Sequence, residues 1–293
     1  MDSRAFRRFR RNKGALAGLV LVVAVTVLGL LGPWLAPYDP VEQFMDALLL
    51  GNGLPAGPGV EPGHWLGGDI LARDELSRLL SGARVSMLVA YLATALAVLI
   101  GVTLGLVSGY VGGRVDTLLM RMVDVVLSMP FLLIAIVMQR VWDAPGFLLI
   151  AIVMQRVWDA PGIWTICVVL GVLSWTTLAR VTRAKTMEAR ELDYVLAARA
   201  LGLRHIRILA RHVLPNVIGP IIAIATILVA RMIIAESALS FLGLGWGSML
   251  NDSQSLLLGV PRLTLYPAVL ISMAVFGFNL FGEGLRDAFD PKD

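Results

Sequence analysis

Long apolar segments separated by short polar ones dominate this chain. A helix needs about 20 mostly apolar residues to cross a bilayer. Segments of about this length lie at Gly14–Ala36, Val85–Val111, Leu118–Met138, Ile163–Ala179, Val213 to about Gly243, and Leu263–Phe281. The short alternating segments of a membrane barrel are missing, and backbone groups in hydrocarbon must be hydrogen-bonded within a helix instead. The pattern therefore predicts an all-α integral membrane protein with six transmembrane helices.

The polar segments divide the chain into three predicted regions. Residues 1–36 form a basic N-terminus with the first span, and residues 37–84 form a Gly- and Pro-rich loop. Residues 85–293 form a core that contains the other five spans. The first span is expected to stay as an anchor and not to be cleaved as a signal peptide, because its uncharged run is long and no A-x-A site follows.

A basic, helix-forming segment lies between the fourth and fifth spans. Asp193 is expected to cap a helix over the Ala-rich residues that follow, and Gly202 to end it in the left-handed conformation. A second helix then has apolar positions at helical spacing until Pro215, which is expected to end it. The sequence thus predicts a helix-turn-helix at about residues 183–212, with a face of small residues.

Composition agrees with a membrane protein, and charge orients it. Hydrophobic residues make up 57% of the chain and charged residues 16%, and the mean hydropathy is +0.78. Lys and Arg gather before the first span and between the fourth and fifth spans, so both termini and the helix-turn-helix are predicted in the cytoplasm. This bias explains the sequence pI of about 9.6 without a nucleic-acid partner.

The second span carries a nearly bare helical face. Small residues recur there at every fourth position, namely Gly101, Gly105, Gly109 and Gly113. This spacing lets helix backbones approach closely within a membrane. Static helix packing is the favoured interpretation, and a moving seam is the alternative.

Ionisable residues within the spans are expected to face protein or a water-filled path, because their burial in lipid is costly. Three such residues are Asp124, Arg231 and Glu236. Arg231 and Glu236 are five apart, which is poor spacing for a pair on one helix face, so each is expected to have a partner elsewhere. Asp124 is expected to pair locally with Arg121. These residues could form structural ion pairs or line a transport pathway, and the sequence favours neither role.

Two identical copies of FLLIAIVMQRVWDAPG occupy residues 131–146 and 147–162. The apolar part of the second copy is too short to cross a bilayer as a helix. The extra copy is therefore expected to lie outside the six-span core, where it would bulge outside the membrane, re-enter it or extend a helix beyond it, with a helix break near Pro145.

The chain has no sequence signature of catalysis or of metal binding. It lacks GxxxxGK[ST], HExxH, CxxC and GxSxG. His64, His205 and His212 have no companion ligands in sequence, and Cys167 is the single cysteine, interpreted as a buried apolar residue. We therefore expect no enzyme activity, cofactor or metal in this chain, and the energy for any transport must come from a partner.

Several segments resemble the permeases of ABC importers. The cytoplasmic EAA loop of that family is matched by Leu196-Ala197-Ala198, Gly202 and Leu214-Pro215, with Leu196 where the family has Glu. The GRDxxSRxxxGxRxS pattern of the dipeptide/oligopeptide/nickel subfamily is matched by Arg73-Asp74, Ser77-Arg78, Gly82 and Arg84 to Ser86, with Ala72 in place of the first Gly. ESALSFLGLG at 236–245, GEGLRDAFDP at 282–291 and WLAPYDP at 34–40 also resemble its C-type subunit. The Gln-Pro-Pro loop that usually follows SFLGLG is absent.

The resemblance implies a multi-pass permease subunit of the bacterial inner membrane that forms half of an import pathway. Its implied partners are membrane lipid, a homologous permease subunit as heterodimer, ABC ATPases that bind ATP-Mg, and an extracytoplasmic substrate-binding protein. The implied ATPase-coupling residues are Ala197, Ala198, Gly202, Arg207, Leu214 and Pro215. A di- or oligopeptide is the implied substrate, and nickel, glutathione or an oligosaccharide are alternatives.

Two other classes of protein share the membrane fold. An ion-coupled secondary transporter would be expected to show inverted repeats with matching broken helices, which are not evident. A non-transporting membrane scaffold would be expected to have a larger extracytoplasmic loop. Neither class accounts for the EAA-like segment.

Overall fold

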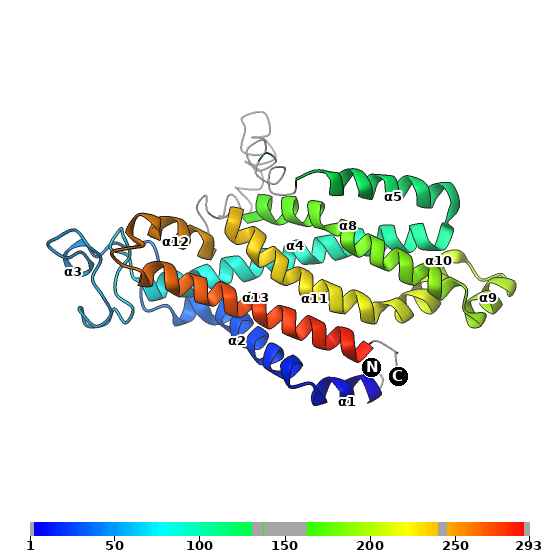
Figure 1. Cartoon of the computed structure of the whole chain (residues 1–293), viewed down its shortest axis with the longest axis horizontal. Helices are drawn as coiled ribbons and strands as arrows, with labels where there is room; N and C mark the ends of the chain where they lie inside the picture. The colour runs from blue at the N-terminus through cyan, green and yellow to red at the C-terminus, as the bar shows by residue number, and fades with distance from the viewer. Residues whose placement is uncertain (1–2, 131–136, 138–162, 240–244, 290–293) are drawn as a thin grey trace. The chain divides into compact units, whose positions relative to one another are not determined.

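A computed structural model describes residues 3–130, 137, 163–239 and 245–289, and helices make up the fold (Figure 1). The longer helices are α1 (Ser3–Arg11), α2 (Lys13–Leu35), α4 (Glu75–Val111), α5 (Gly113–Ser128), α8 (Ile163–Arg190), α9 (Asp193–Ala200), α11 (Leu214–Leu239), α12 (Gly245–Ser253) and α13 (Arg262–Phe289). The short elements are α3 (Met45–Leu48), α10 (His205–Ile208), the π-helical turn η2 (Leu209–Val213) and the 3₁₀ turn η4 (Gln254–Leu256).

Among the described residues, five helical segments are long and apolar enough to cross a membrane. They are Lys13–Leu35, Glu75–Val111, Ile163–Arg190, His205–Leu239 and Arg262–Phe289. Each contains most or all of one predicted span. The described part of the remaining predicted span, Leu118–Met138, belongs mostly to α5. The prediction of an all-α membrane fold is confirmed.

Helix α4 begins ten residues before the predicted start of its span at Val85. Asp74 caps it, because the Ser77 N–H donates to Asp74 Oδ2 at 2.8 Å and so satisfies one of the free donors of the first turn. With 37 residues the helix is about 55 Å long, well beyond the roughly 30 Å hydrocarbon core. The first turns of α4 therefore lie outside the membrane-spanning part.

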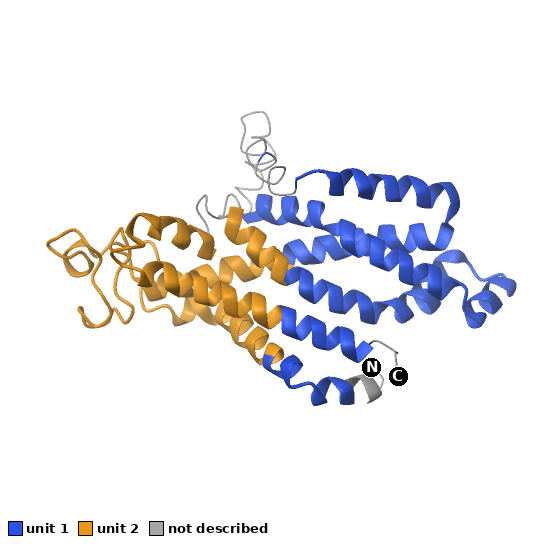
Figure 2. Cartoon of the chain, in the orientation of Figure 1, with its two compact units in different colours: residues 1–17, 92–229, 279–293 blue, residues 18–91, 230–278 orange. Residues whose placement is uncertain are grey.

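The chain divides into two compact units (Figure 2). Unit 1 comprises residues 1–17, 92–229 and 279–293, and unit 2 comprises residues 18–91 and 230–278. Within unit 2, the loop of residues 37–74 has its own small apolar core of Leu48, Ala56 and Ala72. Tyr38 and His64 stack beside it with ring centroids 4.3 Å apart. This loop is a packed element held on the start of α4.

The tandem repeat at 131–146 and 147–162 lies, except for Val137, outside the described residues. Its expected exclusion from the core and the break near Pro145 therefore stay predictions.

Candidate functional site

The predicted helix-turn-helix is present in unit 1 as α9 and α10, but its start differs from the prediction. Leu192, not Asp193, is the N-cap residue, and no side chain caps the helix. The Leu192 carbonyl accepts the N–H groups of Val195 at 2.8 Å and Leu196 at 3.0 Å, which sets the start one residue earlier. Asp193 instead lies in the first turn, where a negative charge is favourable at the positive end of the helix dipole.

Gly202 ends α9 as predicted. Its φ is +76°, in the left-handed region that favours glycine. The Leu203 N–H donates to the Ala198 carbonyl at 3.2 Å, and the Gly202 N–H donates to the Arg199 carbonyl at 3.0 Å. These two bonds form a Schellman motif, which turns the chain sharply toward α10.

The prediction that Pro215 ends the second helix is wrong. Helical structure is continuous from His205 to Leu239, and Pro215 lies inside it. Proline lacks an N–H and its ring crowds the carbonyl four residues earlier, here Arg211. The π-helical turn η2 at Leu209–Val213 widens the backbone at that point, which lets the helix continue.

The loop formed by α9 and α10 exposes apolar side chains. Ala197 and Gly202 are exposed, and beside them Leu201 and Ile206 are 81% and 72% exposed. Ala198, by contrast, is only 5% exposed and packs inward. The loop therefore presents an apolar, partly small-residue surface of the kind that marks an interaction site.

The other predicted coupling residues differ in exposure. Arg207 and Pro215 are exposed, and Leu214 is half-buried. Leu196, at the family's Glu position, is also exposed, so this chain offers an apolar side chain where the resemblance would have implied a charge.

Tyr110 connects this loop to the end of α4. Its hydroxyl and His205 Nδ1 on α10 are hydrogen-bonded at 3.0 Å. The Arg199 guanidinium on α9 lies over the Tyr110 ring, 5.2 Å from its centroid, in a cation–π contact. Tyr110 is buried, so both helices of the loop are fixed to a single side chain of α4.

An ion pair between α8 and α5 stabilises the turn that connects α4 to α5. Arg183 on α8 donates to both carboxylate oxygens of Asp116, with Nη2 2.6 Å from Oδ2, and Ser108 donates to Oδ1 at 2.5 Å. Arg190 Nη1 donates to the Gly109 carbonyl at 3.0 Å. The hydrogen bond from Arg183 lowers the pKa of Asp116, because it stabilises the carboxylate.

Asp116→Asn is expected to destabilise the folded chain by roughly 1–2 kcal/mol at neutral pH, because it removes charge-assisted hydrogen bonds. A lowered pKa means that this stabilisation is present above the usual Asp value of 3.8 and is lost as pH falls through the lowered value. Thermal unfolding of both proteins across acidic pH checks this. A difference in unfolding midpoint that stays constant down to the lowest pH would contradict it.

The glycine face of α4 packs against α8. A Cβ atom at Gly101 would lie 2.7 Å from Leu178 Cβ, one at Gly105 2.6 Å from Thr182 Cβ, and one at Gly109 2.7 Å from Thr186 Cβ. Gly113 does not share this contact, since a Cβ there would meet nothing within 4 Å. It is the first residue of α5 and has a φ of +57°, so it serves the turn between the helices.

The predicted intramembrane charges have different surroundings. Asp124 accepts a hydrogen bond from Arg180 Nη2 on α8 at 2.6 Å, and so pairs across helices and not with Arg121 as expected. Glu236 in unit 2 is fully buried, and Arg231 is exposed without an ion pair to any described residue. The structure does not bring Arg231 and Glu236 together as an ion pair.

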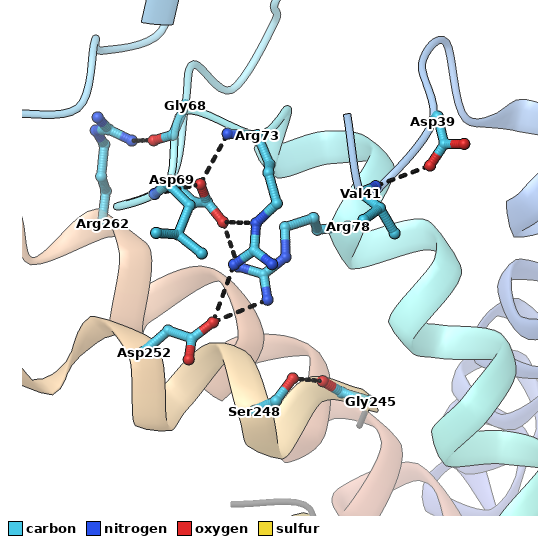
Figure 3. Close-up of polar contacts among 11 residues, drawn as sticks. Asp39, Val41, Gly68, Asp69, Arg73, Arg78, Gly245, Ser248, Asp252 and Arg262 are labelled. Atoms are coloured by element: carbon cyan, nitrogen blue, oxygen red, sulfur yellow. Dashed lines mark hydrogen bonds and ion pairs between the residues drawn. The ribbon is translucent and has the colours of Figure 1, made fainter. Parts of the chain in front are cut away.

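Unit 2 contains a polar cluster that the sequence did not predict (Figure 3). Asp69 Oδ2 accepts from Arg73 Nε at 2.7 Å and from Arg78 Nη1 at 2.5 Å. The same two arginines donate to Asp252 Oδ2 on α12, at 3.2 and 3.0 Å. The cluster joins the loop 37–74, the start of α4 and α12.

The segment that matches the GRDxxSRxxxGxRxS pattern, residues 72–86, makes further contacts with α12. The Trp246 indole N–H donates to the Leu79 carbonyl at 3.0 Å, and its backbone N–H donates to Ser86 Oγ at 3.3 Å. Gly82 lies against Trp246, where a Cβ would be 3.1 Å from Cδ1. Ala72, at the motif's first Gly position, has a φ of 57°, which explains why glycine suits that position.

Arg262, at the start of α13, fixes the loop from its other side. Its guanidinium donates to the carbonyls of Ala56 at 2.8 Å, Pro55 at 3.0 Å, and Leu66 and Gly68 at 3.4 Å each. This one side chain adds hydrogen-bond donors to carbonyl groups of the irregular loop backbone, one of which, Ala56, also accepts the Gly68 N–H at 3.0 Å.

Comparison with known proteins covers nearly the whole chain. Residues 101–292 match the family described as binding-protein-dependent transport system inner membrane component. Residues 3–51 match the N-terminal TM domain of oligopeptide transport permease C. The chain is 38% identical to a dipeptide transport system permease protein of Bacillus subtilis, over 98% of this chain and 85% of the relative.

Two further relatives show the same extent of similarity. The chain is 36% identical to an oligopeptide transport system permease protein of Escherichia coli K12, over 99% of this chain and 90% of the relative. It is 35% identical to a glutathione transport system permease protein of Shigella flexneri, over 98% of this chain and 89% of the relative.

Proposed function

The chain belongs to the family of binding-protein-dependent transport system inner membrane components, as a C-type permease subunit of an ABC importer, and from this premise we propose how it works. It forms half of a membrane pathway for di- or oligopeptides. A homologous permease subunit forms the other half, separate ABC ATPases bind ATP-Mg, and an extracytoplasmic protein delivers the substrate. The termini and the α9–α10 loop face the cytoplasm.

The observation that carries this proposal is the two-sided character of the α9–α10 loop. Its outer side exposes Ala197, Leu201 and Ile206, an apolar surface that suits a groove on an ATPase. Its inner side is fixed to Tyr110 of α4 through His205 and Arg199. A displacement of the loop by the ATPase would therefore be passed to α4, which packs along α8.

The two states of such a pathway require an element that has two arrangements. The bare face of Gly101, Gly105 and Gly109 suits this role, because a face without side chains offers little resistance to a small sliding movement. Binding and hydrolysis of ATP by the partners would then shift the population between inward-open and outward-open states.

Uptake of a labelled dipeptide into vesicles that contain the complete complex tests this function. We expect uptake to require ATP, the ATPase subunits and the binding protein, and to survive an ionophore that dissipates ion gradients. This chain alone should not hydrolyse ATP, because its sequence contains no phosphate-binding loop. Uptake that stops directly when the gradient collapses would instead assign an ion-coupled secondary transporter.

A further inference from the structure

Glu75, the first residue of α4, is a buried carboxyl group without an adequate partner. It is 1% exposed, and its Oε1 atom has no hydrogen-bond partner among the described residues. Burying an ionised carboxylate without compensation is strongly unfavourable. Some ligand or a proton must therefore make up for the missing interaction.

The carboxyl group lines a small pocket beside the cluster of Figure 3. Its lining includes Asp69, Glu75, Arg78, Met249, Asp252 and Leu263. Its free space has room for about one water molecule. Only a very small ligand can reach Glu75 there.

The arginines nearest to Glu75 already have other partners. Arg78 is bonded to both Asp69 and Asp252, and Arg262 donates to backbone carbonyls. The charges that act on Glu75 come from Arg78 on α4, Arg262 on α13, and Asp69 and Asp74 on the loop, while Asp252 on α12 lines the pocket. Positive and negative charges thus largely cancel around it.

Burial therefore dominates the ionisation of this group. Glu75 precedes the apolar stretch that begins at Val85, and so lies outside the membrane-spanning part of α4. Desolvation raises the pKa of Glu75 from 4.5 to about 8. Within the described residues no group of three or more His, Cys, Asp and Glu side chains could hold a metal ion. A proton fits the carboxyl group, because it removes the charge whose burial is unfavourable.

We propose that Glu75 is a proton-binding site whose bound proton keeps α12 and the loop 37–74 fastened to the start of α4. Glu75 and Arg78 are three residues apart on one helix face, close enough to interact. An ionised Glu75 would compete for Arg78 and weaken its hydrogen bond to Asp252. Loss of the proton would thereby weaken the attachment of α12 to the start of α4. Alkaline conditions would therefore destabilise this part of unit 2.

The test compares the thermal unfolding midpoint of the wild-type complex in lipid nanodiscs with that of a Glu75→Gln complex, between about pH 5 and 9. A raised pKa means that the stabilisation is complete below the usual Glu value of 4.5 and is lost as pH rises through about 8. We expect the wild-type midpoint to fall by a few degrees over this range. Glutamine mimics the protonated group, so the variant should lack that fall.

Glu42→Gln provides the matched control, because the substitution is the same and Glu42 is an exposed carboxylate on the same loop. Its midpoint should follow the wild type. An unchanged pH dependence in Glu75→Gln would overturn the proposal. Stabilisation of the wild type by added sodium at alkaline pH, absent in Glu75→Gln, would assign a bound cation and also overturn it.

Infrared spectroscopy keeps the proposal falsifiable if Glu75→Gln does not assemble. The wild-type complex should show the absorption of a protonated, buried carboxyl group at neutral pH, and this band should disappear at alkaline pH. Glu75→Asp should shift the band. Absence of any such band at neutral pH would refute proton binding.

Discussion

Replacing Ala197 with Trp is expected to abolish substrate-stimulated ATP hydrolysis by the reconstituted importer, while the chain still inserts and assembles. Ala197 is exposed on α9, so a large side chain there alters the outer surface of the loop and leaves its packing on α4 intact. Disruption of a hot spot at the centre of an interface costs about 2 kcal/mol or more, so ATPase affinity should fall roughly 30-fold or further. ATP turnover with and without substrate, measured beside co-purification of the ATPase, checks this.

Three further variants help to separate loss of docking from damage to the fold. Ala197→Ser keeps the small size and should couple normally. Ala198→Trp should impair folding itself, since Ala198 is buried. Gly202→Trp should uncouple as well, but its φ of +76° adds backbone strain for any side chain. Normal substrate stimulation in Ala197→Trp would refute docking through this surface.

Replacing Gly105 with Leu is expected to prevent stable accumulation of the permease. A Cβ at this position would lie 2.6 Å from Thr182 Cβ and 2.7 Å from the Ala179 carbonyl oxygen on α8, so the helices must separate. Overpacking of a well-packed site typically costs about 1–3 kcal/mol, and backbone contacts place this change at the upper end. The yield of folded complex and its unfolding midpoint measure the effect.

Gly51→Leu serves as the control for that substitution. A Cβ at Gly51 would meet nothing within 4 Å, so the same gain in bulk should change neither yield nor midpoint. Gly105→Ala should give an intermediate loss, because it adds only the Cβ. Wild-type yield and midpoint in Gly105→Leu would show that α4 and α8 do not pack in this way.

Short-range patterns in the sequence predicted the long apolar helices and the end of α9, because both depend on residues close together in the chain. Apolar length predicted the helices that are long and apolar enough to cross a membrane, since segments of about 20 apolar residues suit helices and not the short alternating strands of a barrel. Gly202 predicted the end of α9, because few residues other than glycine adopt its φ readily. Pro215 led to a wrong prediction of a helix end, since the π-helical turn before it relieves the usual clash between a proline ring and the carbonyl four residues earlier.

Contacts between distant residues could not be predicted in this way. Arg73 and Arg78 reach Asp252 across 179 and 174 residues of sequence, and nothing in the local pattern relates these positions. The sequence motif indicates a family resemblance but not its structural role, and the structure shows that Trp246 contacts Leu79, Gly82 and Ser86. The pocket at Glu75 could not be predicted either, because its lining residues come from four separate segments of the chain.

The contacts of Arg262 have a consequence for biosynthesis. Its guanidinium binds the Pro55 carbonyl 207 residues earlier in the chain. At about 5–20 residues per second, a ribosome needs roughly 10–40 s to make that intervening stretch. During this interval four carbonyl groups of the loop 37–74 lack the hydrogen bonds that Arg262 later donates. A nascent chain truncated before Arg262 should therefore be more sensitive to proteolysis in this loop. The loop acquires its full set of hydrogen bonds only after synthesis of α13 has begun.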